Sequence, residues 1–233
     1  MDPQLRASAG HSAQWRVALR SRPAKIILAV TVTLGVLGAI ATAFGLPANA
    51  RTFAAINASC QLILSVGVAF LGVLALKALR RPTTVSCAIR AVLAALVLAA
   101  GVGLLGVVVS AIATALTPSS APVGPRYVAV LAAAASPLIQ MLAQLVGTGM
   151  GLLLPRRPVF GCLLTVLLPL GVWLLVGLVE ALHPAREWLT PFGAVSGLLS
   201  GSDQVVPWLQ WLTVVIIWGG GLTGVGIRHA TSR

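Results

Sequence analysis

The chain has 233 residues, of which 58% are hydrophobic and 9% are charged, and its formal net charge is +12. A mean hydropathy of +0.99 excludes a soluble domain with one apolar core and indicates an integral membrane protein. In a membrane protein, cations at the ends of apolar stretches fix the topology and contact anionic lipid headgroups. The net positive charge therefore does not indicate a nucleic-acid partner, and none is expected. Cys60, Cys87 and Cys162 form neither a disulfide framework nor a metal-binding pattern.

Residues 1–25 form a basic segment that we expect to lie on the cytoplasmic face of the membrane. Trp15 and Leu19 fall on one face of a short helix, and Arg16 and Arg20 fall on another. This pattern predicts an interfacial amphipathic helix. A basic tail without helical structure is the alternative.

Six apolar stretches follow, each long enough to cross a hydrocarbon core of about 30 Å at about 1.5 Å rise per residue. They cover residues 26–46, 58–76, 91–116, 127–154, 159–182 and 208–227. The predicted fold is therefore all-α and polytopic, with a single six-helix transmembrane domain over residues 26–228 and a cytoplasmic tail over residues 229–233.

The loop between the second and third spans orients the chain. Residues 77–90 (KALRRPTTVSCAIR) hold four cations and no acid, which is typical of a cytoplasmic loop. The N-terminus, this loop, the turn at 156–157 and the C-terminus together hold thirteen of the sixteen cations. We therefore expect both termini in the cytoplasm. The abundance of arginine, alanine and glycine indicates a bacterial source, and so the bacterial inner membrane.

A polar stripe runs down the fourth span. Ser136, Gln140, Gln144 and Thr148 recur every four residues and so share one face of a helix. Polar side chains at membrane depth need partners or water. The sequence leaves two interpretations open: the stripe lines a translocation pathway or a subunit seam, or it forms interhelical hydrogen bonds. In the second span, Gln61 and Ser65 are candidates for the same interior.

Glycine pairs indicate close helix packing. Gly147 and Gly151 form one small-x-x-x-small pair, and Gly220 and Gly224 form another. Whether these pairs pack within one subunit or across a dimer stays open. The run 101–106 matches the G-x-G-x-x-G pattern of dinucleotide-binding folds, but it lies inside a membrane span, where the pattern favours packing.

No constellation of catalytic residues is present. No carboxylate lies near the middle of a span, and His11, His183 and His229 are scattered along the chain. The sequence also has no G-x-x-x-x-G-K-[ST] phosphate loop. We therefore expect neither an enzyme nor a metal or cofactor site in this chain.

Three segments carry a family resemblance: residues 147–157 (GTGMGLLLPRR), 187–199 (EWLTPFGAVSGLL) and 208–218 (WLQWLTVVIIW). With six spans and a basic loop after the second, the chain resembles the ATP-binding-cassette type-2 export permeases. The resemblance covers most of the chain and consists of hydropathy and small residues. It implies a transmembrane subunit of an exporter. The apolar interior with few charges favours an amphipathic or lipid-like substrate. A non-transporting membrane scaffold or assembly subunit is the alternative.

The resemblance also implies partners and a coupling site. The permease would pair with a second permease subunit, the same or homologous, and with separate ATPase subunits that bind ATP and Mg²⁺. A cytoplasmic coupling helix maps onto residues 79–90, with Leu79, Arg80, Arg81, Thr83, Thr84 and Arg90 as the contact residues. Short re-entrant helices map onto residues 184–207. Many relatives carry an acidic residue near the start of the coupling loop, and this sequence has none there.

Overall fold

The computed structural model describes residues 22–78, 85–118, 120, 126–200 and 204–231, and all regular secondary structure in these residues is helical. The predicted interfacial helix lies within residues 1–21, outside the described part of the chain. The helices, in order, are α2 (Arg22–Gly45), η1 (Ala48–Ala50), α3 (Phe53–Ala78), α4 (Val85–Leu116), α5 (Arg126–Leu153), α6 (Pro158–Leu178), η2 (Glu180–Ala185), α7 (Arg186–Leu189), α8 (Pro191–Leu199), α9 (Val205–Val214), η3 (Val215–Gly221) and α10 (Leu222–Thr231).

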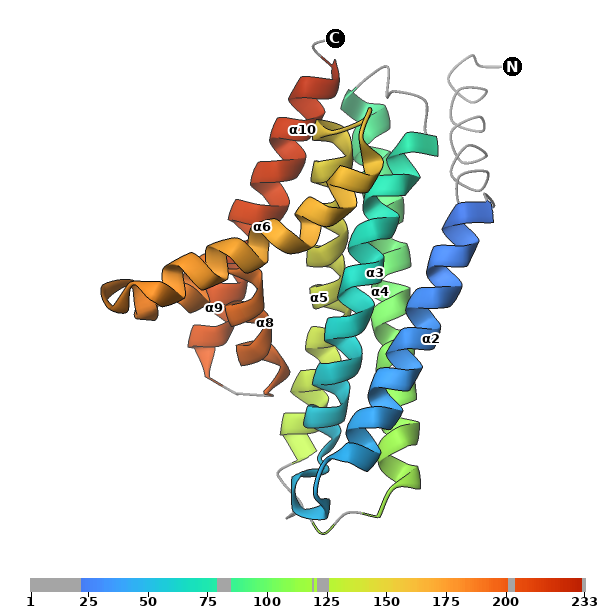
Figure 1. Cartoon of the computed structure of the whole chain (residues 1–233), viewed down its shortest axis with the longest axis vertical. Coiled ribbons are helices and arrows are strands. Elements are labelled where there is room, and N and C mark those ends of the chain that lie inside the picture. Colours follow the sequence, from blue (N-terminus) through green and yellow to red (C-terminus); the bar gives the residue numbers. More distant parts are fainter. Residues whose placement is uncertain (1–21, 79–84, 119, 121–125, 201–203, 232–233) are drawn as a thin grey trace.

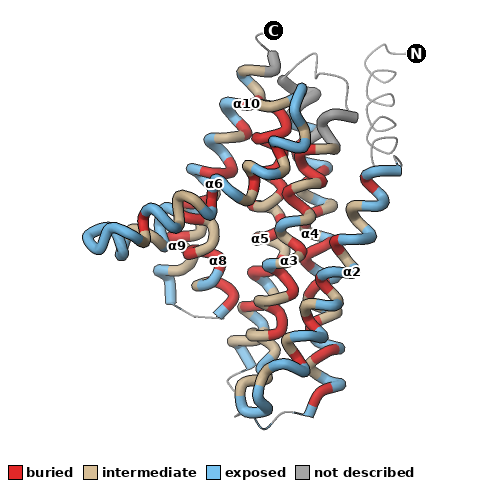
Figure 2. Tube along the Cα trace, in the orientation of Figure 1, coloured by how far each residue is buried: buried red, intermediate tan, exposed pale blue. Residues whose placement is uncertain are grey.

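Six segments of the described chain are long and apolar enough to cross a membrane. Five are single helices, and the sixth combines α9, η3 and α10. Large apolar side chains cover the outward surfaces, as at Val97 and Leu178, which are 74% and 80% exposed. Buried residues gather where the helices pack against one another (Figure 2). Only a lipid solvent leaves so much apolar surface uncovered at no cost. The prediction of an all-α polytopic membrane protein is confirmed.

The first four spans run along the long axis of the molecule, and α6 leaves them obliquely (Figure 1). Helices α3 and α5 make the most extensive contact and occupy the centre. The start of α2, the end of α3, the start of α4 and the end of α10 lie at the same end of the bundle (Figure 1). Six crossings return the chain to this end.

The contact between α3 and α5 depends on glycines in both helices. A Cβ at Gly72 of α3 would lie 2.8 Å from a backbone nitrogen of α5, and one at Gly151 of α5 would lie 2.9 Å from the Cα of Val73. A Cβ at Gly147 would overlap the backbone of Ala69. The first of the predicted glycine pairs therefore lies inside the subunit, where it lets two backbones approach closely.

Helix α2 packs on α3 through small residues on one of its faces. Thr31, Gly35, Ala39 and Ala43 are buried at four-residue spacing, while the larger side chains of α2 point away from the bundle. A Cβ at Gly35 would lie 2.6 Å from Leu64 of α3. The first span is thus held by the same small-residue packing as the central pair.

The fifth span ends earlier than its apolar run predicts. Helix α6 stops at Leu178, whereas the sequence pattern extends to residue 182. Val179 is extended, with φ −101° and ψ 106°, and the following 3₁₀ segment contains Pro184. The extended Val179 ends the helix, and Pro184, which has no amide hydrogen and restricts His183, keeps the α-helix from resuming directly after it.

The two glycine pairs give a matched stability test. Replacing Gly147 by Ala places a methyl group against the α3 backbone, and we expect the free energy of unfolding in detergent to fall by about 1–3 kcal/mol. The control is Gly224→Ala, where no atom lies within 4 Å of the added Cβ. Thermal melting of the two purified variants measures the difference. Equal melting temperatures would contradict the packing role of Gly147.

Candidate functional site

The polar stripe of the fourth span faces the interior of the described chain. Ser136 and Gln140 have no exposed surface, and Gln144 and Thr148 are 2% exposed. All four belong to α5. Helix α3, packed closely against α5, supplies buried polar partners.

Hydrogen bonds join part of this stripe to α3 and α4. Gln140 Nε2 donates to the backbone oxygen and to Oε1 of Gln61, at 2.9 and 2.8 Å. Gln61 Nε2 donates to Gly103 O of α4 at 2.9 Å and to Asn57 Oδ1 at 3.3 Å. Asn57 Nδ2 donates to Ser136 Oγ at 2.9 Å. Asn57, Gln61, Ser136 and Gln140, here called the amide cluster, therefore connect three helices.

Two glycines of the G-x-G-x-x-G run make room for the amide cluster. A Cβ at Gly106 would lie 2.6 Å from Gln61 Nε2, and one at Gly103 would lie 2.7 Å from the Cα of Pro137. Gly101 is exposed, and a Cβ added there would have no atom within 4 Å. Here the run brings α4 against α3 and α5, as expected for packing glycines.

The C-terminal half of the stripe is arranged differently. Gln144 Nε2 donates to Thr148 Oγ1 at 3.3 Å, one turn along the same helix. Both residues sit where Gly72 of α3 approaches the α5 backbone. Gln140 Oε1 is buried and has no donor among the described residues. Interhelical hydrogen bonding thus accounts for Ser136 and Gln140, whereas a pathway or seam role for the stripe stays a prediction.

Asn57 is the member of the amide cluster that was not predicted from the sequence. It lies one turn before Gln61, so the two face the same side of α3. That four-residue spacing is the signal that would have found it. Ser65, another candidate, donates instead to Leu62 O within its own helix at 2.7 Å.

The connection between the fifth and sixth spans returns to the bundle as a helical hairpin. Helix α8 packs on α5 and α9, and Ala194, Val195, Leu198 and Leu199 are buried there. The side-chain oxygen of Thr190 accepts from Gly193 N at 3.3 Å and caps the start of α8. Helices α7 and α8 occupy the region where re-entrant helices are expected.

The last span holds this hairpin in place. Trp218 Nε1 donates to Leu189 O at 2.8 Å, and Gln210 Nε2 donates to Glu187 Oε2 at 3.0 Å. Trp218 lies within η3, a π-helical segment over Val215–Gly221. Such segments are rare and are found frequently at functional sites. The π-helix therefore coincides with the anchor of the α7–α8 hairpin.

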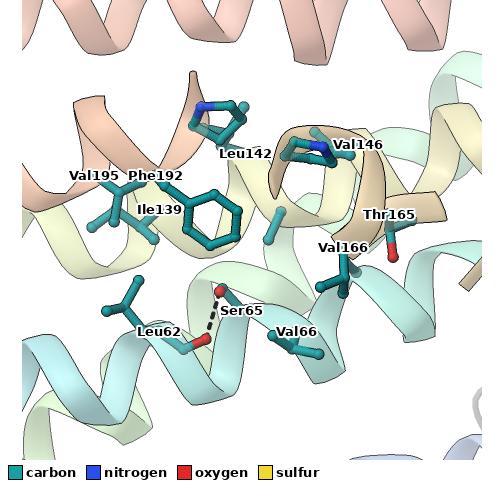
Figure 3. Close-up of a pocket in the computed structure, with 14 residues that line it drawn as sticks. Leu62, Ser65, Val66, Ile139, Leu142, Val146, Thr165, Val166, Phe192 and Val195 are labelled. Atoms are coloured by element: carbon teal, nitrogen blue, oxygen red, sulfur yellow. Dashed lines mark hydrogen bonds between the residues drawn. The ribbon is translucent and has the colours of Figure 1, made fainter. Parts of the chain in front are cut away.

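An apolar pocket lies between α3, α5, α6 and α8. Its volume is about 70 Å³. Figure 3 shows the ring of Phe192 between residues of α3 and residues of α5. None of the four stripe residues lines the pocket, because the lining residues of α5, among them Ile139 and Leu142, lie on a different face of that helix.

The remaining predicted site residues are dispersed. Leu79, Arg80, Arg81, Thr83 and Thr84 of the expected coupling loop lie outside the described residues, and Arg90 is exposed near the start of α4. Gly220 and Gly224 are exposed on the last span, and no neighbouring helix of the described chain contacts them. In the described part of the chain, no group of His, Cys, Asp or Glu side chains is arranged to hold a metal ion.

A double-mutant cycle tests the amide cluster. Because Gln140 donates twice to Gln61, replacing each by Leu singly and together should give a coupling energy of about 0.6 kcal/mol, and at most ~1.7 kcal/mol. The control cycle pairs Gln61 with Gln144, which share no hydrogen bond among those described, and should give a coupling near zero. Unfolding in detergent measures both. Equal coupling energies in the two cycles would contradict a hydrogen-bonded link between Gln61 and Gln140.

The spans, the amide cluster, the hairpin and the apolar pocket together describe a membrane protein with a polar seam inside its helix bundle. Comparisons of the chain with family models, curated protein sequences and solved structures gave no match. The resemblance to export permeases therefore stays a prediction that depends on the sequence segments and the topology.

Proposed function

We propose that this chain is the transmembrane permease subunit of an ATP-driven exporter. The observation that carries the proposal is the α7–α8 hairpin, which lies between the fifth and sixth spans and is tied to the last span through Leu189 and Trp218. It occupies the place where the resemblance expects re-entrant helices. The six spans support the same assignment, as does the position of the start of α2 and the end of α10 at the same end of the bundle (Figure 1).

In this proposal the chain transports and a partner supplies the energy. The sequence has no phosphate-binding loop, so ATP and Mg²⁺ bind to separate ATPase subunits, and the chain itself is not an enzyme. ATP binding on those subunits would draw the cytoplasmic loops together. The substrate, an amphipathic or lipid-like molecule, would leave between this subunit and a second permease subunit in the bacterial inner membrane.

Affinity purification in mild detergent tests the proposal directly. We expect an ATP-hydrolysing subunit with a phosphate-loop motif to co-purify with the full chain. Reversing the charge of Arg80 and Arg81 to Glu should weaken this association strongly, because these residues belong to the expected coupling loop. Co-purified ATPase activity per mole of permease is the quantity to measure.

The matched control reverses Arg156 and Arg157 to Glu, in the turn between α5 and α6. This change alters the same number of charges at another loop and should leave the association nearly intact. An equal loss in the two variants would remove the special role of residues 79–90. Recovery of the chain without any ATPase partner would count against the exporter itself.

A second candidate function is a non-transporting scaffold of a larger membrane complex. The amide cluster favours it, since Asn57, Gln61, Ser136 and Gln140 are engaged with one another and buried among α3, α4 and α5. A scaffold needs such internal bonding and no pathway. The exposed pair Gly220 and Gly224 would then contact a partner helix.

The substitution Gln144→Leu separates the two functions. If the chain is an exporter with the stripe near its pathway, we expect substrate export to fall while co-purification with partners is retained. If the chain is a scaffold, we expect assembly to weaken and no transport readout to exist. The comparison uses transport into inside-out vesicles beside the same pull-down, with the exposed substitution Val130→Leu as control.

A further inference from the structure

The walls of the pocket between α3, α5, α6 and α8 favour an apolar occupant. Its two hydroxyl groups are already engaged: Ser65 Oγ donates to Leu62 O at 2.7 Å, as drawn in Figure 3, and Thr165 Oγ1 donates to Cys162 O at 2.7 Å. The other lining residues are aliphatic side chains, prolines and the ring of Phe192. A polar ligand would find no hydrogen-bond donor among the lining side chains.

The size of the pocket suits a short segment of a narrow apolar chain. A volume of about 70 Å³ is less than half of the roughly 150 Å³ at which an apolar protein cavity accommodates benzene. An acyl chain is narrower than an aromatic ring and is the most abundant apolar segment around a membrane protein. The walls contain several outward-facing residues of the bundle, among them Leu62 and Val66, which are 38% and 37% exposed.

A cation of α7, Arg186, stacks on α6 near this pocket. The guanidinium carbon of Arg186 is 3.4 Å from the centroid of the Trp173 ring, and a Cβ at Gly177 would lie 3.4 Å from that carbon. Arg186 Nε is buried and has no acceptor among the described residues. A buried guanidinium nitrogen of this kind favours an anion, because charge-assisted hydrogen bonds to phosphate are strong.

Arg186 is linked to the pocket through α6 and through the start of α8. On α6, Pro169 lines the pocket and Trp173 follows one turn later. On the hairpin, Arg186 O accepts from Thr190 N and Oγ1, and Pro191 and Phe192 next line the pocket. The guanidinium contacts Trp173 and the site of Gly177, one and two turns beyond Pro169, so it lies roughly 6–12 Å along α6 from the pocket. This distance is within one leaflet of the roughly 30 Å hydrocarbon core.

The acid next to Arg186 in the sequence does not neutralise this cation in the described contacts. Glu187 follows Arg186 directly, but its Oε2 accepts from Gln210 Nε2 of α9 at 3.0 Å. His183, also in this region, contacts Gly177 O at 2.7 Å through its ring nitrogen. Neither residue supplies an acceptor to Arg186 Nε.

We propose that this pocket binds one anionic phospholipid of the surrounding membrane, with a segment of one acyl chain between α3, α5, α6 and α8 and the phosphate at Arg186. The apolar walls select the chain, and the stacked guanidinium selects the charge of the headgroup. The site goes beyond the proposed export function, since a resident lipid binds whether or not an ATPase partner is present. It requires only the described residues of this chain.

Photolabelling of the purified full-length protein in mixed micelles tests the proposal. The probe is phosphatidylglycerol with a diazirine in one acyl chain, and labelled residues are mapped by peptide mass spectrometry. We expect labels on the segments of α6 and α8 that line the pocket. Unlabelled phosphatidylglycerol should compete more strongly than phosphatidylcholine with the same acyl chains, a comparison that needs no variant.

Two pairs of variants separate the headgroup from the chain. Arg186→Gln should lower the labelling by phosphatidylglycerol about tenfold, as expected on losing a charge-assisted hydrogen bond at a poorly solvated site, whereas Arg126→Gln, at an exposed cation of α5, should not. Ala143→Leu fills the pocket and should reduce labelling, whereas Ala134→Leu on the exposed face of α5 should not.

Several outcomes would overturn the site. Equal competition by the two lipids would remove the selectivity for an anion, and unchanged labelling of Arg186→Gln would remove the role of that residue. Labels spread over all lipid-facing helices would show that the pocket holds no particular lipid. Because these measurements need no ATPase, they stand apart from the pull-down that tests the export function.

Discussion

The structure depends on the close contact between α3 and α5. In a bilayer the hydrophobic effect does not drive helices together, so van der Waals packing and buried hydrogen bonds must do so. Gly72, Gly147 and Gly151 allow the two backbones to approach, and the bonds between Gln61 and Gln140 fix their relative rotation. Helices α2, α4 and α10 pack on this pair. The orientation of the remaining helices thus follows from a contact between two segments about 80 residues apart.

The number of spans was predictable from the sequence, because long apolar runs have few alternatives in a membrane protein. The spacing of Ser136, Gln140, Gln144 and Thr148 also predicted a shared face. The helices that this face contacts were not predictable, because hydropathy does not show how helices pack. The stacking of Arg186 on Trp173 was not predictable for the same reason, since it joins a cation of the short helix α7 to the side of a membrane helix.

The polar and apolar features of α5 lie on separate faces, and this separation bears on both candidate functions. The amide cluster holds the bundle together from within, whereas Ile139 and Leu142 face a pocket shared with α6 and α8. A helix with these two faces can keep its internal bonds while the α7–α8 hairpin or α6 moves beside it. An exporter would use that independence for transport, and a scaffold would use it to accommodate lipid between stable helices.

The π-helical segment Val215–Gly221 determines which faces of the last span point toward the bundle before and after it. A π-turn takes up more residues than the 3.6 of an α-turn, so residues after the segment are rotated relative to those before it. With this phase Trp218 reaches Leu189, while Thr223 donates to Leu145 O at 3.0 Å and Gly226 meets Leu152. Removing one residue here would turn α10 by about 100° and face these groups toward lipid. The length of this segment, more than its composition, allows one span to contact both the hairpin and α5.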